Sequence, residues 1–184
     1  KKEMIFLKKN KPWGIIIFSR NIKGFEQIKK LIVSIRSIFK DKNYPILIDQ
    51  EGGRVNRLNK LIESSNLTAG FFGNLYKTDK KKFFIYYKVY ISQISYLLNE
   101  IGVNINTVPI LDVRRLKSNN IIGDRSYSSL PKNVSKIGDF CIEEFNKNNI
   151  GTVIKHLPGH GLAKVDSHKL THILKKKIKY LSKN

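Results

Sequence analysis

The 184-residue sequence predicts an α/β fold, specifically about half of a TIM-like (β/α)8 barrel. Short apolar runs alternate four times with amphipathic helical patterns, which is typical of a parallel sheet with crossover helices. Polar side chains follow each run at its carboxyl end, as they do at the mouth of a barrel. A doubly wound sheet would gather them at one switch point after a Gly-rich turn, and the sequence has no G-x-G-x-x-G or Walker-type loop.

The first two apolar runs and the helix between them have clear periodicity. Residues 14–19 form a β-branched, nearly continuous run, as expected for a strand that is covered on both faces. Residues 28–38 then place isoleucine and leucine on one helical stripe. The second run, residues 44–49, leads into the polar segment 50–54. The pattern predicts one complete strand–helix unit and the start of the next.

The rest of the chain predicts two further strands and two further helices. In order they are a long aromatic-rich helix from about Lys80 to Glu100 with Gly102 as its stop signal, a third run at 106–113, a helix capped by Asn133 that extends to about Asn148, and a fourth run at 152–156. Pro109 would be unsuitable in a central antiparallel strand, but it is compatible with the irregular end of a barrel strand.

The length fits a single domain, yet a complete barrel of this type has eight strands and about 250 residues. Only four strands are predicted here. We therefore expect residues 1–184 to be a partial barrel domain, truncated at both ends, because the chain also opens at Lys1 without an initiator methionine.

Composition excludes several other classes of protein. The net charge of +21 comes mainly from 28 lysines spread along the chain, against 7 arginines, which indicates a solvated lysine surface rather than a specific nucleic-acid site. No stretch approaches the roughly 18 apolar residues of a membrane span, so no membrane partner is expected. The single cysteine, Cys141, lies in an apolar periodic stretch and is expected to be a buried, inert thiol.

All four histidines lie between His156 and His172, which indicates a site for proton transfer or metal binding. His156 and His160, like His168 and His172, are four positions apart, a spacing that can bind zinc on a helix. However, Pro158 interrupts the first pair and neither pair carries the glutamate of H-E-x-x-H. We therefore expect no metal site.

Five ordered motifs carry a resemblance to a known family. They are KPWGIIIFSRN at 11–21, IDQEGGRVNRL at 48–58, VPILDV at 108–113, IGDRSY at 122–127 and KHLPGHGLAKVDSH at 155–168. With them the chain resembles glycoside hydrolase family 3, and in particular its bacterial β-N-acetylglucosaminidases (β-N-acetylhexosaminidases) of peptidoglycan recycling. The resemblance implies a cytoplasmic enzyme without a cofactor that removes terminal non-reducing N-acetylglucosamine from muropeptides with retention of configuration.

The resemblance also implies roles for individual residues. It assigns substrate binding to Asp49, Arg57, Arg125, Lys155 and His156. Carboxylates accept hydrogen bonds from sugar hydroxyls and guanidinium groups donate them, so these residue types suit a saccharide. The structural alternatives are a simple ion pair between Asp49 and Arg57, and a solvated cation at Lys155.

The resemblance assigns proton transfer to His168 as general acid/base, oriented by Asp166. An imidazolium can protonate the leaving glycosidic oxygen near neutral pH, and the carboxylate would fix its tautomer and favour its protonated form. A purely structural His–Asp pair is the alternative. His160 and His172 are assigned no catalytic role.

The nucleophile of a retaining glycosidase has no match in this chain. In the family it is an aspartate in a motif resembling Phe-Ser-Asp-Asp-Leu after a later strand, which the sequence lacks. Glu51 and Asp112 lie at the predicted mouth but do not match that motif, and Asp112 is expected to hold loops together. The chain would then be a fragment, a truncated gene product, or one half of a split enzyme that needs a C-terminal half.

Three functional hypotheses follow from the sequence. The first is a β-N-acetylhexosaminidase represented by part of its barrel, acting on a small N-acetylglucosamine-containing saccharide. The second is a catalytically inactive sugar-binding or scaffold remnant of that family. The third is a polyanion-binding protein, whose affinity would fall steeply with salt.

Overall fold

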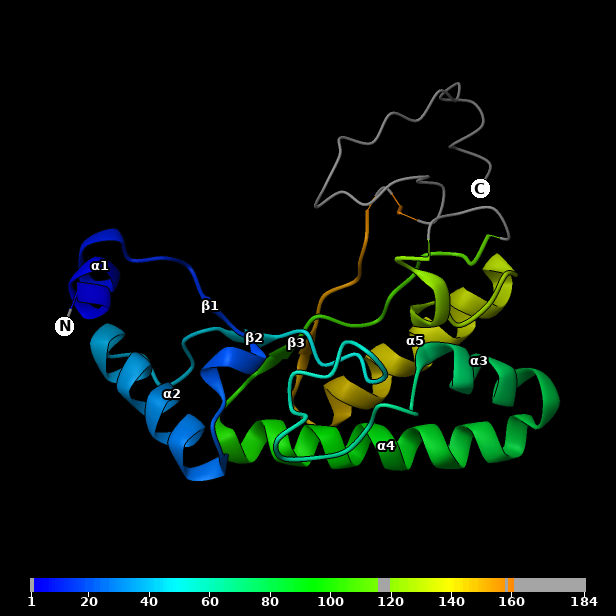
Figure 1. The fold of residues 1–184 in the computed structure, drawn as a ribbon, viewed down its shortest axis with the longest axis horizontal. Helices are drawn as coiled ribbons and strands as arrows, with labels where there is room; N and C mark the ends of the chain where they lie inside the picture. The colour runs from blue at the N-terminus through cyan, green and yellow to red at the C-terminus, as the bar shows by residue number, and fades with distance from the viewer. Residues whose placement is uncertain (1, 116–119, 158, 161–184) are drawn as a thin grey trace, which may run out of the picture.

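A computed structural model describes residues 2–115, 120–157 and 159–160, which form an α/β structure (Figure 1). Four parallel strands are hydrogen-bonded in chain order: β1 (Ile15–Ile17), β2 (Ile46–Ile48), β3 (Ile105–Asn106) and β4 (Gly151–Thr152). A doubly wound sheet reverses its strand order at a switch point, whereas a barrel keeps it. The observed order agrees with the predicted half-barrel.

Helices connect the strands and cover the sheet (Figure 1). In the described residues they are α1 (Lys2–Asn10), α2 (Phe25–Phe39), α3 (Ala69–Thr78), α4 (Lys80–Ile101) and α5 (Pro131–Lys147), with the short 3₁₀ helices η1 (Ser19–Asn21) and η2 (Gly123–Arg125). Helix α4 packs against α2, α3 and α5. It ends at Gly102, which has a left-handed φ of 88°, so the predicted stop signal is confirmed.

Two helices, α1 and α3, have no counterpart in the sequence-based expectations. The sequence of helix α1 lacks a strong apolar stripe, and the helix buries none of its residues. Helix α3 is short and contains Gly70 and Gly73, which are poor helix formers. Its start signal is Thr68, whose hydroxyl accepts a hydrogen bond from the backbone N–H of Phe71 at 2.9 Å.

The predicted cap of α5 at Asn133 is wrong. The helix begins at Pro131, with Leu130 in the cap position, and Asn133 lies within the first turn. Proline suits this first position because the backbone N–H that it lacks would have no partner inside the helix.

The third and fourth apolar runs are regular strands only at their beginnings. Beyond β3 and β4 they continue side by side as irregular extended chain. The backbone N–H of Leu111 donates to the carbonyl of Lys155 at 2.7 Å, and the N–H of Lys155 donates to the carbonyl of Pro109 at 3.2 Å. This pairing keeps the two segments together where the polar residues of the barrel mouth begin.

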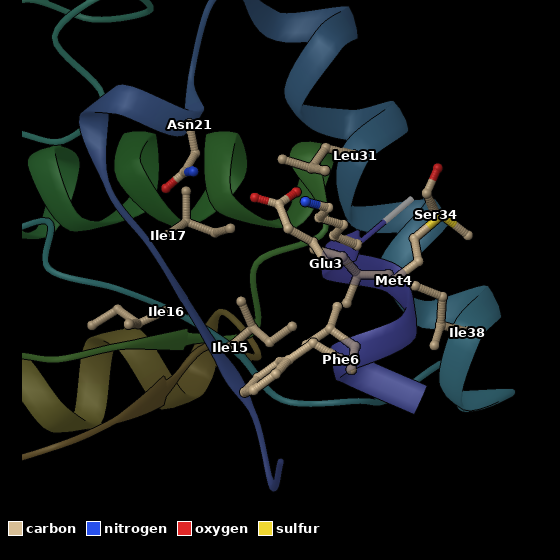
Figure 2. A pocket seen from close by; sticks show the side chains of 13 residues that line it. Glu3, Met4, Phe6, Ile15, Ile16, Ile17, Asn21, Leu31, Ser34 and Ile38 are labelled. Atoms are coloured by element: carbon tan, nitrogen blue, oxygen red, sulfur yellow. The ribbon is translucent and has the colours of Figure 1, made fainter. Parts of the chain in front are cut away.

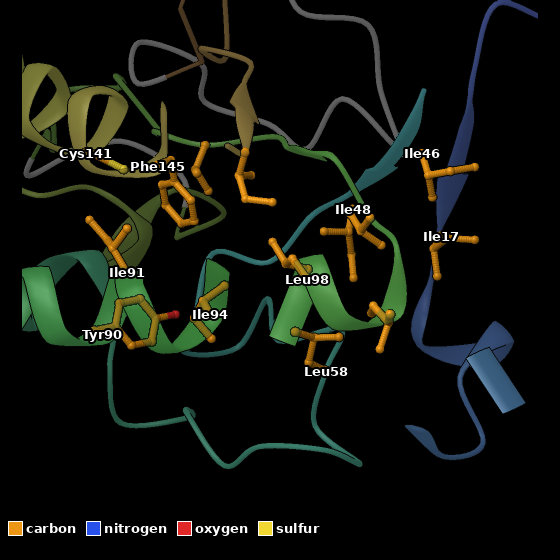
Figure 3. Close-up of a cluster of buried hydrophobic side chains, with 14 of the residues drawn as sticks. Ile17, Ile46, Ile48, Leu58, Tyr90, Ile91, Ile94, Leu98, Cys141 and Phe145 are labelled. Atoms are coloured by element: carbon orange, nitrogen blue, oxygen red, sulfur yellow. The ribbon is translucent and has the colours of Figure 1, made fainter. Parts of the chain in front are cut away.

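The core lies between the sheet and the helices (Figure 3). Strand isoleucines such as Ile46 and Ile48 pack with Ile94 and Leu98 of α4, and all four are fully buried. Cys141 of α5 belongs to this core, and burial raises the pKa of its thiol to about 11. The structure therefore agrees with the expectation of a buried, inert cysteine.

Both outer strands of the sheet have one strand neighbour among the described residues, β2 for β1 and β3 for β4. Apolar side chains remain exposed there: Ile16 at 39% and Val153 and Ile154 at 41%. A pocket of about 830 Å³ lies beside β1, between α1 and α2, and is lined mainly by apolar side chains (Figure 2). In the part of the chain that the structure describes, no helix has the length and apolar character to cross a membrane.

We predict that Gly73→Ala lowers the free energy of unfolding by about 1–3 kcal/mol, the usual cost of overpacking. A Cβ at Gly73 would lie 1.6 Å from the carbonyl oxygen of Tyr127, so α3 and the segment after η2 would have to move apart. Urea denaturation followed by circular dichroism measures the change.

Gly24→Ala is the matched control, because a Cβ at Gly24 meets no atom within 4 Å. We expect it to change the free energy of unfolding by less than about 1 kcal/mol, the usual effect of a poorer helix cap. Equal effects of the two substitutions would contradict the close packing of α3 on this segment.

Candidate active site

The polar residues of the site follow directly on the parallel strands. Asp49 and Glu51 come after β2, Thr107 follows β3, and Lys155 lies shortly after β4. Because the strands are parallel and paired in register, their carboxyl ends meet at one edge of the sheet. Residues up to 106 positions apart in sequence thereby come into direct contact.

Two buried amides fix the backbone at this edge. The side chain of Asn106 accepts from the N–H of Gln50 and donates to its carbonyl, both at 3.0 Å. The side-chain oxygen of Gln50 in turn accepts from the N–H groups of Arg57 and Leu58 at 2.9 and 3.0 Å. Gln50 and Asn106 are almost fully buried, so this network holds the 49–58 segment rigidly on the end of the sheet.

Asp49 lies at the centre of the first charge cluster. Its Oδ1 accepts a hydrogen bond from Lys155 Nζ at 2.9 Å and another from the Thr107 hydroxyl, while its Oδ2 lies 3.6 Å from Arg57 Nη2. Burial by itself would raise the pKa of the Asp49 carboxyl, but the Thr107 hydrogen bond and the Lys155 cation outweigh it and lower that pKa. Asp49 is therefore a carboxylate at neutral pH.

Glu51 forms the second cluster with Arg125 and Lys155. Arg125 donates to Glu51 through Nε at 2.8 Å and Nη2 at 2.9 Å, and Lys155 Nζ lies 2.8 Å from Glu51 Oε1. Burial disfavours the Arg125 charge, but the hydrogen bonds and the negative charge of Glu51 raise the pKa of Arg125 above its ordinary value. Lys155 thus joins the two carboxylates into one network.

Arg54 holds the loop that precedes Arg125. Arg54 Nη2 donates to the carbonyls of Asn120, Ile121 and Ile122 at 2.7, 2.6 and 3.1 Å. Its Nε forms an ion pair with Asp124 at 3.1 Å. The segment that carries Arg125 is thereby tied to the turn that carries Glu51.

His156 is held by the buried carboxylate of Asp112, which lies on the segment that follows β3. Its Nδ1 lies 2.7 Å from Asp112 Oδ2, and its backbone N–H donates to the same oxygen at 3.2 Å. Asp112 Oδ1 also accepts from the backbone N–H of His160. Asp112 therefore joins the 112 and 156–160 segments, as expected for a residue that holds loops together, and the other ring nitrogen of His156, Nε2, faces away from this carboxylate.

The packing of the turn explains why residues 52 and 53 are glycines. They adopt left-handed φ values of 85° and 58°, and a Cβ would lie 2.3 Å from the Leu67 carbonyl oxygen and 2.6 Å from Thr68 Cγ2. Glycine is therefore required by the tight turn and by its packing on residues 67–68. No approach of a ligand is needed to account for it.

The structure brings together most of the residues singled out in the sequence. Asp49, Arg57, Arg125 and Lys155 belong to one network, and His156 lies beside Lys155 on the same segment. The ion pair of Asp49 with Arg57 exists, and Lys155 is largely buried rather than solvated. The proposed proton-transfer pair, Asp166 and His168, lies outside the described residues, as does His172.

Sequence reasoning gave no binding role to Glu51 and did not identify Thr107. Their signals were present, because Glu51 lies two residues after Asp49 and Thr107 lies at the end of the third run. Among the residues that the structure describes, no group of three or more His, Cys, Asp or Glu side chains could hold a metal ion.

The N–H groups of Lys155 and Arg125 that have no acceptor among the described residues determine which ligand oxygens the carboxyl edge of the sheet can bind. The ammonium of Lys155 has three N–H groups and lies near three acceptors, in Asp49, Glu51 and Thr107, at 2.8–3.1 Å. Arg125 uses three of its five N–H groups on Glu51 and the Ile121 carbonyl. Within the described part of the chain, Arg125 therefore retains two N–H groups for a hydroxyl or carbonyl oxygen.

The sequence is similar to known glycoside hydrolases along its whole length. The family model for the glycosyl hydrolase family 3 N terminal domain matches residues 1–184. Beta-hexosaminidase A of Pseudoalteromonas piscicida is 35% identical over 161 residues, covering 84% of this chain and 26% of that protein. A beta-hexosaminidase of Xanthomonas campestris pv. campestris is 30% identical over 155 residues, covering 84% of this chain and 46% of that one.

Solved structures show the same architecture. Native NagZ from Neisseria gonorrhoeae superposes with a TM-score of 0.84 at 24% identity, covering 100% of this chain and 53% of that chain. A glycoside hydrolase family 3 beta-N-acetylglucosaminidase from Paenibacillus sp. gives a TM-score of 0.81 at 28% identity, covering 97% of this chain and 33% of that chain. The fold is therefore about half of the structure it matches in NagZ. The chain spans less than half the length of the curated relatives named above, and it belongs to glycosyl hydrolase family 3, where it corresponds to the N-terminal domain.

Proposed function

We propose that this chain provides the sugar-binding part of a β-N-acetylhexosaminidase active site. The observation that carries the proposal is the single network of Asp49, Arg57, Arg125 and Lys155 at the carboxyl edge of the sheet. In a barrel this edge is where substrate is bound. Relatives that are 30–35% identical to this chain over 155–161 aligned residues are beta-hexosaminidases.

The ligand that suits this network is a neutral sugar rich in hydroxyl groups. The Asp49 carboxylate accepts from vicinal hydroxyls, and Arg57, whose nearest Asp49 oxygen is 3.6 Å away, is free of a tight pairing with it and can donate to the same sugar. NagZ from Neisseria gonorrhoeae has been solved with N-trifluoroacetyl-D-glucosamine. We therefore propose terminal N-acetylglucosamine as the ligand, with muropeptides of peptidoglycan recycling in the cytoplasm as its source.

The proposed reaction is hydrolysis with retention in two steps. His168, oriented by Asp166, protonates the departing glycosidic oxygen while a carboxylate attacks the anomeric carbon and forms a glycosyl–enzyme ester. Water then attacks that carbon, with the deprotonated histidine taking its proton, and the ester bond breaks. No cofactor is required for either step.

The attacking carboxylate is proposed to come from a second half of the barrel. The apolar side chains left exposed along β1 and β4, and the apolar pocket beside β1, support such a complement. So does the share of NagZ that the chain covers, 53%. If no polypeptide supplies that carboxylate, the chain would be the inactive sugar-binding remnant.

We predict that the 184-residue chain binds N-acetylglucosamine and that Asp49→Asn weakens binding at least tenfold, about 1.4 kcal/mol. The substitution keeps the shape of the side chain but removes the charge that accepts from sugar hydroxyls. Isothermal titration calorimetry measures the dissociation constants. Asp139→Asn, at an exposed position of α5, is the control and should bind like the unaltered chain.

Equal binding by the Asp49→Asn chain would count against the proposed sugar site. Absence of sugar binding, together with tight binding to heparin or DNA that falls steeply with salt, would favour the polyanion-binding hypothesis instead.

We also predict that the purified chain releases no p-nitrophenol from p-nitrophenyl N-acetyl-β-D-glucosaminide, because we propose that the attacking carboxylate comes from a second half of the barrel. Absorbance at about 400 nm follows the release over hours. Release that disappears in a His168→Ala chain would show that the 184 residues contain a complete mechanism and would refute the need for a second half.

A further inference from the structure

Glu51 has no place in the proposed sugar contacts, yet it pairs closely with two cations of the mouth, Arg125 and Lys155. Its side chain is only 5% exposed. Oε2 accepts from Arg125 Nε at 2.8 Å, and Oε1 accepts from Arg125 Nη2 at 2.9 Å and from Lys155 Nζ at 2.8 Å. Both oxygens are thus occupied by protein donors, so Glu51 has little access to a sugar itself.

The geometry of this pairing decides which edge of Arg125 is left for a ligand. A carboxylate that binds Nε and Nη2 takes one side of the planar guanidinium and leaves the second N–H of Nη2 and both N–H groups of Nη1 for other partners. Nη1 also donates to the Ile121 carbonyl at 3.2 Å, which fixes rotation of the group. The two N–H groups that have no partner among the described residues are therefore oriented before any ligand arrives.

Glu51 is itself held rigidly. Its backbone N–H donates to the Val55 carbonyl at 3.1 Å, which closes the turn at Gly52 and Gly53. The preceding residue, Gln50, is locked to β3 through Asn106. A rigid support of this kind is what a positioning side chain needs.

Glu51 also sets the charge of the mouth. Arg57, Arg125 and Lys155 face the carboxylates of Asp49 and Glu51. Without Glu51, Arg125 and Lys155 would compete for Asp49, and Lys155 already contacts it at 2.9 Å. Both cations are less than one-fifth exposed, so water would compensate only in part.

We propose that Glu51 is a positioning residue, which aims the two remaining N–H groups of Arg125 at the sugar and keeps Lys155 on Asp49. This inference rests on the proposed function, because it assigns Glu51 its role at that same sugar site. It predicts that removal of the Glu51 charge weakens sugar binding although Glu51 does not touch the sugar.

The test compares Glu51→Gln with the unaltered 184-residue chain by calorimetric titration with N-acetylglucosamine. We expect Glu51→Gln to weaken binding about tenfold or more. The matched control is Glu144→Gln, since Glu144 on α5 is also buried and paired with a lysine, Lys147 at 2.6 Å, but belongs to no part of the mouth. We expect Glu144→Gln to bind within twofold of the unaltered chain, even if both variants lower the melting temperature.

A spectroscopic readout separates positioning from a general loss of stability. In ¹⁵N-labelled chain, the Nε–H resonance of Arg125, identified by its disappearance in Arg125→Lys, should exchange slowly and lie away from those of exposed arginines. Glu51→Gln should move it and speed its exchange, whereas Glu144→Gln should leave it in place. If Glu51→Gln does not fold, Glu51→Asp replaces it, because a carboxylate withdrawn by one methylene cannot reach both cations and should give the same two changes.

Normal sugar binding by a folded Glu51→Gln or Glu51→Asp chain would overturn this inference and leave the proposed function intact. An unaltered chain that binds no N-acetylglucosamine would contradict the proposed function, and the role of Glu51 at the sugar site would fall with it. Weak binding in the Glu144→Gln control equal to that of Glu51→Gln would also overturn the inference, because the loss would then follow from destabilisation.

Discussion

The arrangement of the mouth depends on the cost of enclosing charged groups at the end of a sheet. The side chains of Asp49, Glu51, Arg125 and Lys155 are exposed by 20%, 5%, 17% and 16%. An unpaired charge in such a place costs several kcal/mol, so each group must find its counterpart. Here the counterparts come from segments far apart in sequence, and the requirement to pair them fixes how the turn after β2, the η2 loop and the chain after β4 meet.

The parallel sheet makes this pairing possible because it brings the strand ends to one edge. Asn106 adds the precision, since its amide bonds both backbone groups of Gln50 and prevents β2 and β3 from sliding against each other. The apolar runs and the polar residues after them predicted this edge from sequence, because parallel strands impose a simple rule on where their ends lie. The strand order β1-β2-β3-β4 and the α2, α4 and α5 crossovers follow the same rule.

What the sequence did not reveal depends on contacts that no local pattern encodes. In the sequence, Glu51 cannot be distinguished from the other polar residues that follow a strand. Its importance becomes clear only because the fold brings Arg125 and Lys155 into contact with it. The need for glycine at 52 and 53 comes from the close approach of residues 67–68, which leaves no room for a side chain. Helix α1 was missed because it buries no residue, and the start of α5 was misplaced because Pro131 and Asn133 are both good residues for a helix N-terminus.

The same network also explains how a sugar could enter a site whose charges are already paired. Lys155 has no spare N–H, so a ligand oxygen can reach it only by replacing one of its acceptors, and the longest of these contacts, 3.1 Å, is to the Thr107 hydroxyl. A sugar hydroxyl that takes this place exchanges one neutral acceptor for another, and the ion pairs to Asp49 and Glu51 stay intact. A phosphate or carboxylate ligand would instead bring a negative charge beside two carboxylates that have already neutralised most of the local cations. The pairing that stabilises the empty mouth therefore also favours a neutral, hydroxyl-rich ligand over an anionic one.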